Sequence, residues 1–285
     1  MKLKGTLLTV AVAAALGVSA SAKALTVQGI TFSSGANFEF MEIAESEQSG
    51  NGNGVIDAIG EKLHGILRIT SITDGNGNQT WSNGQDGREL TGYFHDYVAT
   101  EIVSANGKRY IGFTGGALDI YSDNTPNFER NGSQADDIAK ATDSDFAAPW
   151  LSLVGSRIMS DAAPLTNPGL LQTLRTEVGR LAFTGVVSGT GLLDIVGGAA
   201  AQYLDTDAFG ACAIVNGQQV CDTADKTFSS SGQTNLTSRT RPWGLVGTGE
   251  IQDVGSALPE PGGVALFGAA LASMSLISLR RNKKK

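Results

Sequence analysis

The feature that most limits the fold of this chain is a regular series of glycine-containing turn dipeptides. Asn-Gly, Asp-Gly or Gly-Gly interrupts the sequence roughly every 8 to 15 residues. The segments between these turns are rich in β-branched and aromatic residues, and several alternate in polarity. This pattern predicts an all-β fold, which we assign to a β-sandwich. The expected strands cover residues 63–73, 93–103, 109–113, 117–121, 181–187 and 192–196.

Helical signals are weak in the body of the chain. No long segment keeps an apolar period of 3.6 residues, which an amphipathic helix would need. Residues 170–180 fit either a short helix or another strand, and their sequence does not decide between the two.

The N-terminal end has the order of a secretory signal peptide. Lys2 and Lys4 precede an uncharged apolar run of about 12 residues and a stretch of small residues. The apolar run is shorter than the ~20 residues of a lasting membrane helix. We therefore expect residues 1–22 to be removed after Ala22, with Ala24 as the other possible site, and the general secretion machinery to export the rest.

The C-terminal end, residues 258–285, has three parts, each with a physical role. Pro259, Glu260 and Pro261 form a motif that the prolines should keep extended and accessible. Residues 262–279 are uncharged and apolar, and as a helix they would span about 27 Å, close to the hydrocarbon thickness of a bilayer. A basic cluster follows and should remain on the cytoplasmic side. Its members are Arg280, Arg281, Lys283, Lys284 and Lys285.

This C-terminal end resembles the sorting tail of the PEP-CTERM family of exported proteins. The resemblance is carried by the Pro-Glu-Pro motif, the glycine-containing apolar segment and the terminal basic cluster, and it covers about the last 27 residues. It implies recognition and processing by a membrane-embedded exosortase in a Gram-negative bacterium that makes exopolysaccharide. The protein would be held briefly in the inner membrane and then reach the cell surface or extracellular matrix.

Without both end segments the chain is strongly acidic. Seven of the 21 Lys and Arg lie in these ends, which leaves 14 Lys and Arg against all 28 Asp and Glu of residues 23–261. The expected mature body, residues 23–257, therefore carries a large net negative charge. Such a charge argues against nucleic acid as a partner, because phosphate binding needs clustered cations.

Two cysteines flank a predicted hairpin. Asn216-Gly217 is the preferred dipeptide of a two-residue turn, and pairing outward from it places Cys212 directly opposite Cys221. Opposite residues of a non-hydrogen-bonded pair lie within the distance that a disulfide accepts. Because export passes through an oxidising compartment, we expect a disulfide between them.

One glycine-rich segment resembles a calcium loop. With Ser49 as its first position, Asn51, Asn53 and Asp57 occupy ligand positions three, five and nine. The first Asp and the twelfth Glu of such loops are missing. The segment is therefore either a weak calcium site or a turn between strands, and we expect no other cofactor.

The chain offers little support for catalysis. His95 stands beside Asp96, but adjacent residues of a strand point to opposite faces, so we expect that the pair cannot form a charge-supported base. Asp136-Asp137 and the pair Asp143 and Asp145 are expected in an acidic loop rather than in a hydrolase site. We assign no catalytic residue and expect a protein that is not an enzyme.

The aromatic residues allow either a sugar-binding surface or an ordinary core. Trp81, Trp150 and Trp243 lie near turn residues, and Tyr93 and Tyr97 should share one face of a strand. The sequence thus favours an exported envelope or matrix protein with a structural or adhesive role in exopolysaccharide or biofilm. A weakly calcium-dependent carbohydrate-binding module is the first alternative, and an extracellular glycoside hydrolase is the second.

Overall fold

The computed structural model describes residues 24–33, 35–158, 164–165, 172–179, 184–205, 211–215, 218–222, 224–235 and 242–254. The expected signal peptide and the expected sorting tail lie outside these ranges. Within them, no helix has the length and hydropathy needed to cross a membrane.

Strands make up most of the described chain, so the expected all-β class is confirmed. The strands are β1 (Leu25–Val27), β2 (Ile30–Phe32), β3 (Asn37–Ser49), β4 (Lys62–Thr73), β5 (Gln79–Ser82), β6 (Glu89–Ala105), β7 (Lys108–Asp123), β8 (Leu151–Ser156), β9 (Leu174–Val178), β10 (Thr184–Gly197), β11 (Ala211–Val215), β12 (Gln218–Asp222), β13 (Lys226–Asn235) and β14 (Leu245–Asp253). The helical elements are η1 (Gln85–Gly87), α1 (Gln134–Ala141) and α2 (Ala201–Leu204).

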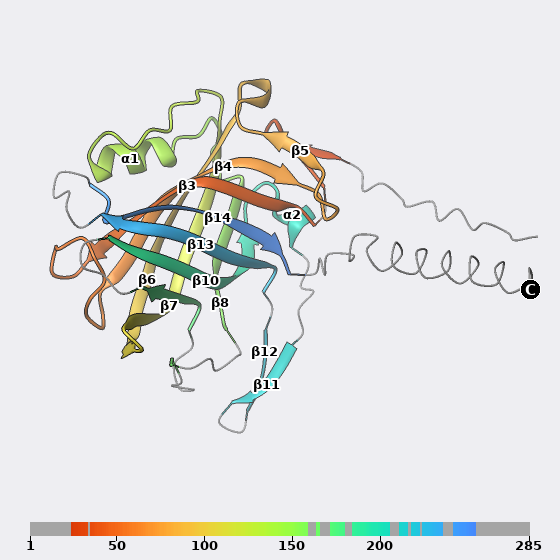
Figure 1. Ribbon diagram of the computed structural model, residues 1–285. Coiled ribbons are helices and arrows are strands. Elements are labelled where there is room, and N and C mark those ends of the chain that lie inside the picture. The colour runs from red at the N-terminus through yellow and green to blue at the C-terminus, as the bar shows by residue number, and fades with distance from the viewer. Residues whose placement is uncertain are drawn as a thin grey trace, which may run out of the picture.

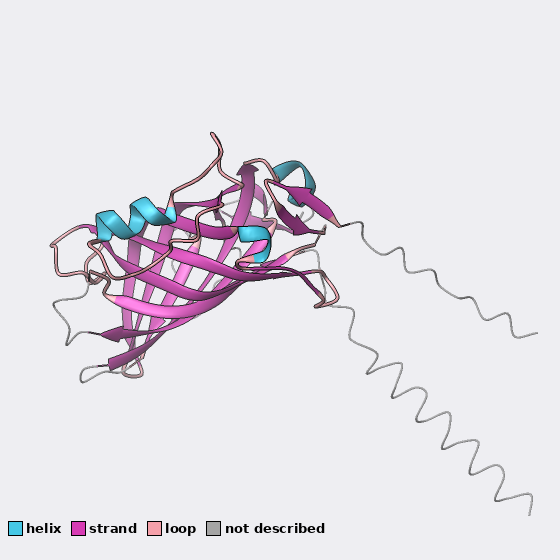
Figure 2. Cartoon of the chain, turned by 90° about the horizontal axis from the view of Figure 1, so that it is seen from above, coloured by secondary structure: helices cyan, strands magenta, loops and turns pink. Residues whose placement is uncertain are grey.

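The main sheet closes on itself as an eight-stranded antiparallel barrel (Figures 1 and 2). Its strand order is β3, β4, β6, β7, β8, β10, β13 and β14, so each strand pairs with the next barrel strand along the chain. β14 pairs back onto β3, and β13 pairs with β10 over its full length. β8 and β9 both pair with β7 on one side and with β10 on the other, at different points along these strands. The two short strands therefore share one position in the barrel.

The expected β-sandwich is wrong, because glycines that suggested turns lie inside long strands. Residues 109–113 and 117–121 belong to the single strand β7, although Gly115 and Gly116 both have positive φ between them. A Cβ on Gly116 would lie 2.3 Å from the ring of Tyr97, so glycine leaves room for an aromatic side chain of the neighbouring strand. Glycine here bends a strand without ending it, and long bent strands can close into a barrel.

Residues 170–180, for which helix and strand were both open, contain β9. Both edges of this short strand are paired with barrel neighbours, and its Thr176 pairs with Ile111 of β7 and with Gly189 of β10. Pairing on both sides satisfies backbone groups that a helix would have satisfied internally.

One end of the barrel is closed by large side chains. Trp150 is fully buried and makes edge contacts with Phe32 and Phe38, at centroid distances of 5.2 and 5.7 Å. Its indole nitrogen donates to the Val27 carbonyl at 3.2 Å, which ties the β1–β2 hairpin to the barrel. Lys226 is also buried at this end, where its ammonium group donates to the Ala36 carbonyl at 3.1 Å.

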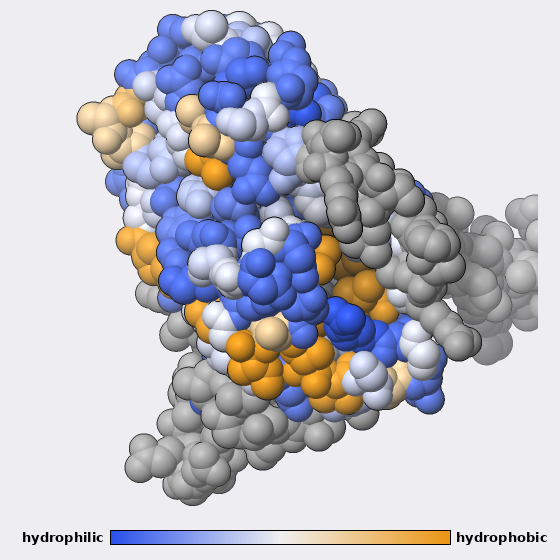
Figure 3. All heavy atoms as spheres, turned by 90° about the vertical axis from the view of Figure 1, so that its left-hand side faces the viewer, coloured by the Kyte–Doolittle hydropathy of each residue, from blue (hydrophilic) through white to orange (hydrophobic). Residues whose placement is uncertain are grey.

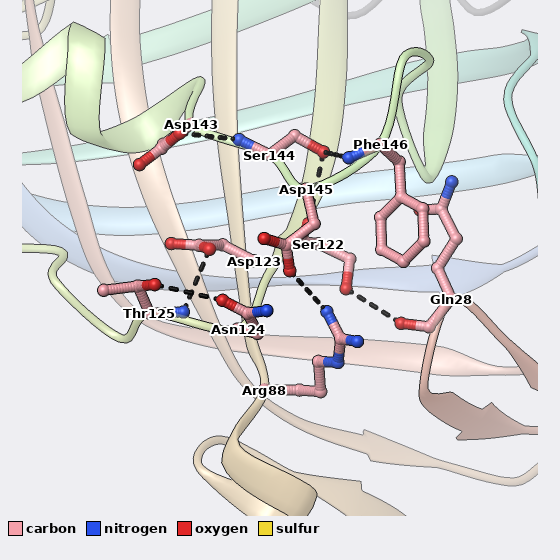
Figure 4. Close-up of polar contacts among 10 residues, drawn as sticks. All are labelled: Gln28, Arg88, Ser122, Asp123, Asn124, Thr125, Asp143, Ser144, Asp145 and Phe146. Atoms are coloured by element: carbon pink, nitrogen blue, oxygen red, sulfur yellow. Dashed lines mark hydrogen bonds and ion pairs between the residues drawn. The ribbon is translucent and has the colours of Figure 1, made fainter.

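The loops of this closed end are held by a chain of polar contacts (Figure 4). Arg88 pairs with Asp145 at 2.7 Å and lies over the ring of Phe146. Ser122 donates to the Gln28 carbonyl at 3.1 Å and thereby joins β7 to the β1–β2 hairpin. Because these contacts cross between separate loops, they fix the closed end as one unit.

Helix α1 covers part of the outer surface of the barrel, over β4 and β6 (Figure 2). Ser133 and Asp136 form a capping box at its start, which satisfies backbone N–H groups of the first turn. Beneath the helix, a small apolar cluster on the outer face contains Ala44, Ile66 and Trp243. Both faces of this part of the sheet are therefore buried.

We expect Gly249→Ala to destabilise the barrel by about 1–3 kcal/mol, the usual cost of overpacking a core. A Cβ at this position of β14 would lie 2.2 Å from ring carbons of Phe40 and 2.3 Å from the Ser229 carbonyl. Gly75→Ala is the matched control, because the nearest atom to its Cβ would be 3.9 Å away. Urea unfolding followed by tryptophan fluorescence measures both, and equal midpoints for the two variants would contradict the packing described.

Candidate functional site

A cavity of about 650 Å³ lies at the end of the barrel opposite the closed one. It is bordered by the β3–β4 loop and by the tip of the β6–β7 hairpin. Figure 3 faces this end of the molecule, where apolar side chains are visible between hydrophilic ones. Its apolar wall comprises Leu63, Ile111, Phe113, Val178, Val187 and Leu245.

Glu45 brings a carboxyl group into this apolar surrounding. It lies on β3 between the buried residues Ile43 and Glu47 and is 8% exposed. It borders the cavity and also a smaller void deeper in the barrel, which Tyr97 and Phe228 line as well. No hydrogen bond or ion pair to its carboxylate comes from the described residues.

The surroundings of Glu45 disfavour its charged form. Burial raises the pKa of Glu45 from 4.5 to about 7, because the carboxylate loses its hydration without gaining a donor. Burial and the nearby Glu45 charge also raise the pKa of Tyr97, which stays a neutral phenol. A carboxyl group with a displaced pKa at the floor of a cavity marks a candidate functional site.

Two other buried carboxylates hold the β3–β4 loop at the rim of the cavity. Glu47 accepts hydrogen bonds from the backbone N–H groups of Gly52 and Gly54, at 2.9 and 3.2 Å. Glu61 accepts from the Asp57 backbone at 2.7 Å. Carboxylates that bind several backbone N–H groups are well satisfied in a buried position. Glu47 and Glu61 therefore have a structural task, whereas no hydrogen bond from the described residues satisfies the Glu45 carboxylate.

The three residues proposed as calcium ligands do come together in this loop. The side-chain amides of Asn51 and Asn53 donate to the two carboxylate oxygens of Asp57, at 2.9 and 2.7 Å. The amide oxygens of both asparagines accept backbone N–H groups in turns. Across the described ranges, no three His, Cys, Asp or Glu side chains form a group that could hold a metal ion. Calcium binding at this loop stays a prediction.

The expectation that His95 and Asp96 point to opposite faces is wrong. The His95 Nδ1 atom lies 2.7 Å from the Asp96 carboxylate, and Lys62 pairs with the other oxygen of Asp96 at 2.7 Å. Asp96 has φ of 60°, so β6 departs from regular pleating at this residue. The hydrogen bonds from Lys62 and His95 lower the pKa of Asp96.

The same departure separates the two tyrosines that were expected on one face. Tyr97 lies in the barrel core, whereas Tyr93 packs against the apolar cluster of the outer face and stacks on His95 at 5.0 Å. The irregularity at Asp96 shifts the side-chain alternation between Phe94 and Tyr97, which both lie in the core although three positions separate them. In this outward group Tyr93 also lies 3.4 Å from His64 Nδ1, and Lys62 pairs with Asp96.

The four aspartates expected in an acidic loop have separate structural roles. Asp136 belongs to the capping box of α1, and Asp137 is fully buried, where it accepts from the Trp243 indole at 2.8 Å. Asp145 pairs with Arg88, and Asp143 accepts from a neighbouring backbone N–H group (Figure 4). These contacts place the acids in a helix and its flanking loops rather than in one solvated loop.

The tryptophans belong to the protein interior. Trp81 and Trp150 are fully buried, and Trp243 is nearly so beneath α1. The sequence allowed the aromatic residues to form either a sugar-binding surface or a core. All three tryptophans belong to a core.

The predicted hairpin register around Asn216-Gly217 is confirmed. β11 pairs with β12 so that Val215 faces Gln218 and Cys212 faces Cys221. The disulfide itself stays a prediction, because the two cysteine side chains lie outside the part of the chain that the structure describes. The sorting motif Pro259, Glu260 and Pro261 and the basic cluster that follows also lie outside it.

Sequence reasoning missed Glu45, although a signal for it exists. Ile43, Glu45 and Glu47 occupy every second position of a segment that the turn pattern did not mark as a strand. Once β3 is recognised, its period of two places both glutamates on the face of Ile43. An acid in register with core residues is the sign of a functional or specially paired group.

We expect Glu45→Gln to remove a pH dependence of stability. Folding raises the pKa of Glu45 from 4.5 to about 7, so the folded state binds this proton more tightly than the unfolded chain. The resulting stability is present below the unfolded pKa and is lost as pH rises through about 7, a change of about 3 kcal/mol. The variant should lack this loss, which urea unfolding between about pH 4 and pH 9 measures.

Glu39→Gln, at an exposed position of the same strand, is the control for this series. Parallel stability curves for wild type and Glu45→Gln across the same pH range would contradict the burial of an unpaired carboxyl group.

No family model, curated protein or solved structure matches this chain. Function therefore has to be inferred from the cavity and the residues that line it.

Proposed function

We propose that this protein is an exported binding protein that holds a small, largely apolar molecule in its barrel cavity. The observation that carries this proposal is the cavity of about 650 Å³, with its aliphatic and aromatic wall and the Glu45 carboxyl group at its floor. Ligand sites for small molecules have volumes of roughly 300–1,000 Å³, mostly apolar walls and few polar groups.

The architecture supports the same proposal. An eight-stranded barrel has an interior that side chains can fill or that can hold one small ligand. Here large side chains fill the closed end, and smaller ones such as Val178 and Val187 leave space at the other. Among the described residues, the cavity therefore lies between the filled end and the tip of the β6–β7 hairpin.

The two ends of the sequence support delivery of this barrel outside the cytoplasm. In the proposal, the signal peptide directs export, and an exosortase processes the Pro-Glu-Pro tail at the inner membrane of a Gram-negative bacterium. The mature protein then acts at the cell surface or in the matrix, in association with exopolysaccharide. Its strong negative charge would keep it soluble there.

A structural or adhesive role in the envelope is the second candidate function. It is favoured by the sorting tail, because that tail addresses the protein to the envelope without implying any ligand. The two candidates differ in one respect: a purely structural protein has no need of a cavity that accepts small molecules.

Filling the cavity should weaken binding strongly. Val187 is 7% exposed and lines the cavity, whereas its neighbour Val186 is 61% exposed on the outer face of β10. We expect Val187→Trp to weaken uptake of a fluorescent apolar dye by about tenfold or more, since an indole would occupy ligand space. Val186→Trp is the matched control and should bind like wild type in equilibrium dialysis. No uptake by the folded wild-type protein would contradict the proposal.

Replacing Pro259, Glu260 and Pro261 with alanines should stop tail processing. We expect the variant to remain uncleaved in the inner membrane, because the exosortase recognises this motif. Cell fractionation with intact mass measurement follows the outcome, and wild-type protein in cells without the sorting enzyme provides the reference. Normal release of the alanine variant would contradict the sorting proposal and leave the binding proposal untouched.

A further inference from the structure

We propose that the ligand of the barrel cavity is an amphipathic amine, whose ammonium group pairs with the Glu45 carboxylate and whose apolar body lies against the aliphatic wall. This inference rests on the proposed function, because it names the chemical class of ligand for the same cavity. It depends on three properties of Glu45, which are its depth, its lack of a described partner and the sign of its charge.

Depth determines the orientation of the ligand. Glu45 pairs in register with Leu245 of β14 and with Gly65 of β4, two residues further into the barrel than Glu47 at the rim. It also borders the smaller void below the cavity. A molecule that enters from the rim passes Leu63, Val178 and Val187 before it reaches the carboxylate. The charged head therefore enters first, and the apolar body remains in the outer cavity.

Glu45 differs in its contacts from the other charged side chains that line the cavity. Lys108 pairs with a glutamate of β9, and Arg109 donates to the Ile56 carbonyl at 3.4 Å. Asp57 accepts from two asparagine amides of its own loop. Among the described residues, Glu45 is the charged group of this lining that no hydrogen bond or ion pair satisfies.

The sign of the charge selects the head group. An ionised carboxylate that is buried without a donor costs several kcal/mol, and a cationic donor can offset this cost. An anionic head would meet like charge from Glu45. A neutral hydroxyl would donate one hydrogen bond but leave the charge uncompensated. Tyr97, the titratable neighbour of Glu45, has a raised pKa and therefore stays neutral.

The test compares three probes that share one chain length, n-octylamine, 1-octanol and octanoate, with the full mature protein. Calorimetry at about pH 8 is suitable, because the Glu45 carboxyl, with a pKa of about 7, is then mostly ionised. We expect wild type to bind octylamine at least about tenfold more tightly than octanol, and octanoate most weakly. In Glu45→Gln this preference should disappear while octanol binding persists. Glu39→Gln, on the exposed side of β3, should keep the wild-type order.

The outcomes separate the two proposals. Equal affinity for octylamine and octanol in wild type, or a preference for octanoate, would overturn the amine inference and leave the binding function standing. If the folded wild-type protein bound none of the three probes and did not bind the apolar dye either, the binding function itself would be overturned. If Glu45→Gln did not fold, the order of affinities in wild type would still decide the matter.

Discussion

Closure of the sheet is the constraint on which the other features of this protein depend. The seam between β10 and β13 runs from Thr184 opposite Asn235 to Leu193 opposite Lys226, and it joins the two halves of the strand order. Without it, the sheet would have two open edges with unpaired backbone groups, and its inward residues would lack the facing wall against which they pack. With it, one face of each of the eight barrel strands becomes interior. The interior is filled at one end by Trp150 and its aromatic neighbours and remains hollow at the other.

The hollow end gives an unusual position to a carboxyl group. In a filled core, the ionised Glu45 carboxylate would only destabilise the folded state. Burial raises its pKa to about 7, and no contact from the described residues compensates for the lost hydration. Beside a cavity, the same residue can discriminate among ligands, because the cost of its burial is recovered only when a suitable donor arrives. The neighbouring acids Glu47 and Glu61 show the contrast, as their backbone partners hold the rim loop in place. β3 thus carries both Glu47, which holds the rim loop, and Glu45, the proposed recognition group.

The all-β class and the hairpin register of Cys212 and Cys221 could be predicted, because both depend on short-range patterns of turns and alternation. Closure into a barrel could not, because Gly115 and Gly116 suggest a turn in sequence but lie within a strand. Whether a glycine ends a strand or bends it is decided by the neighbouring strand, here by the ring of Tyr97. The contact between His95 and Asp96 was missed for a similar reason, since positive φ at Asp96 has no local signal. The candidate site was missed because its residues come from eight strands, and only the closed barrel brings them together.

The most direct measurement of the central claim is a methyl NMR titration of the mature protein with an apolar amine. Leucine, isoleucine and valine methyl groups line the cavity at Leu63, Ile111, Val178 and Val187, while Ile30 at the closed end and Val186 on the outer face provide internal references. The account predicts saturable shifts confined to the cavity methyls. Shifts centred on the outer-face or closed-end methyls, or none at any position, would contradict a ligand site inside the barrel.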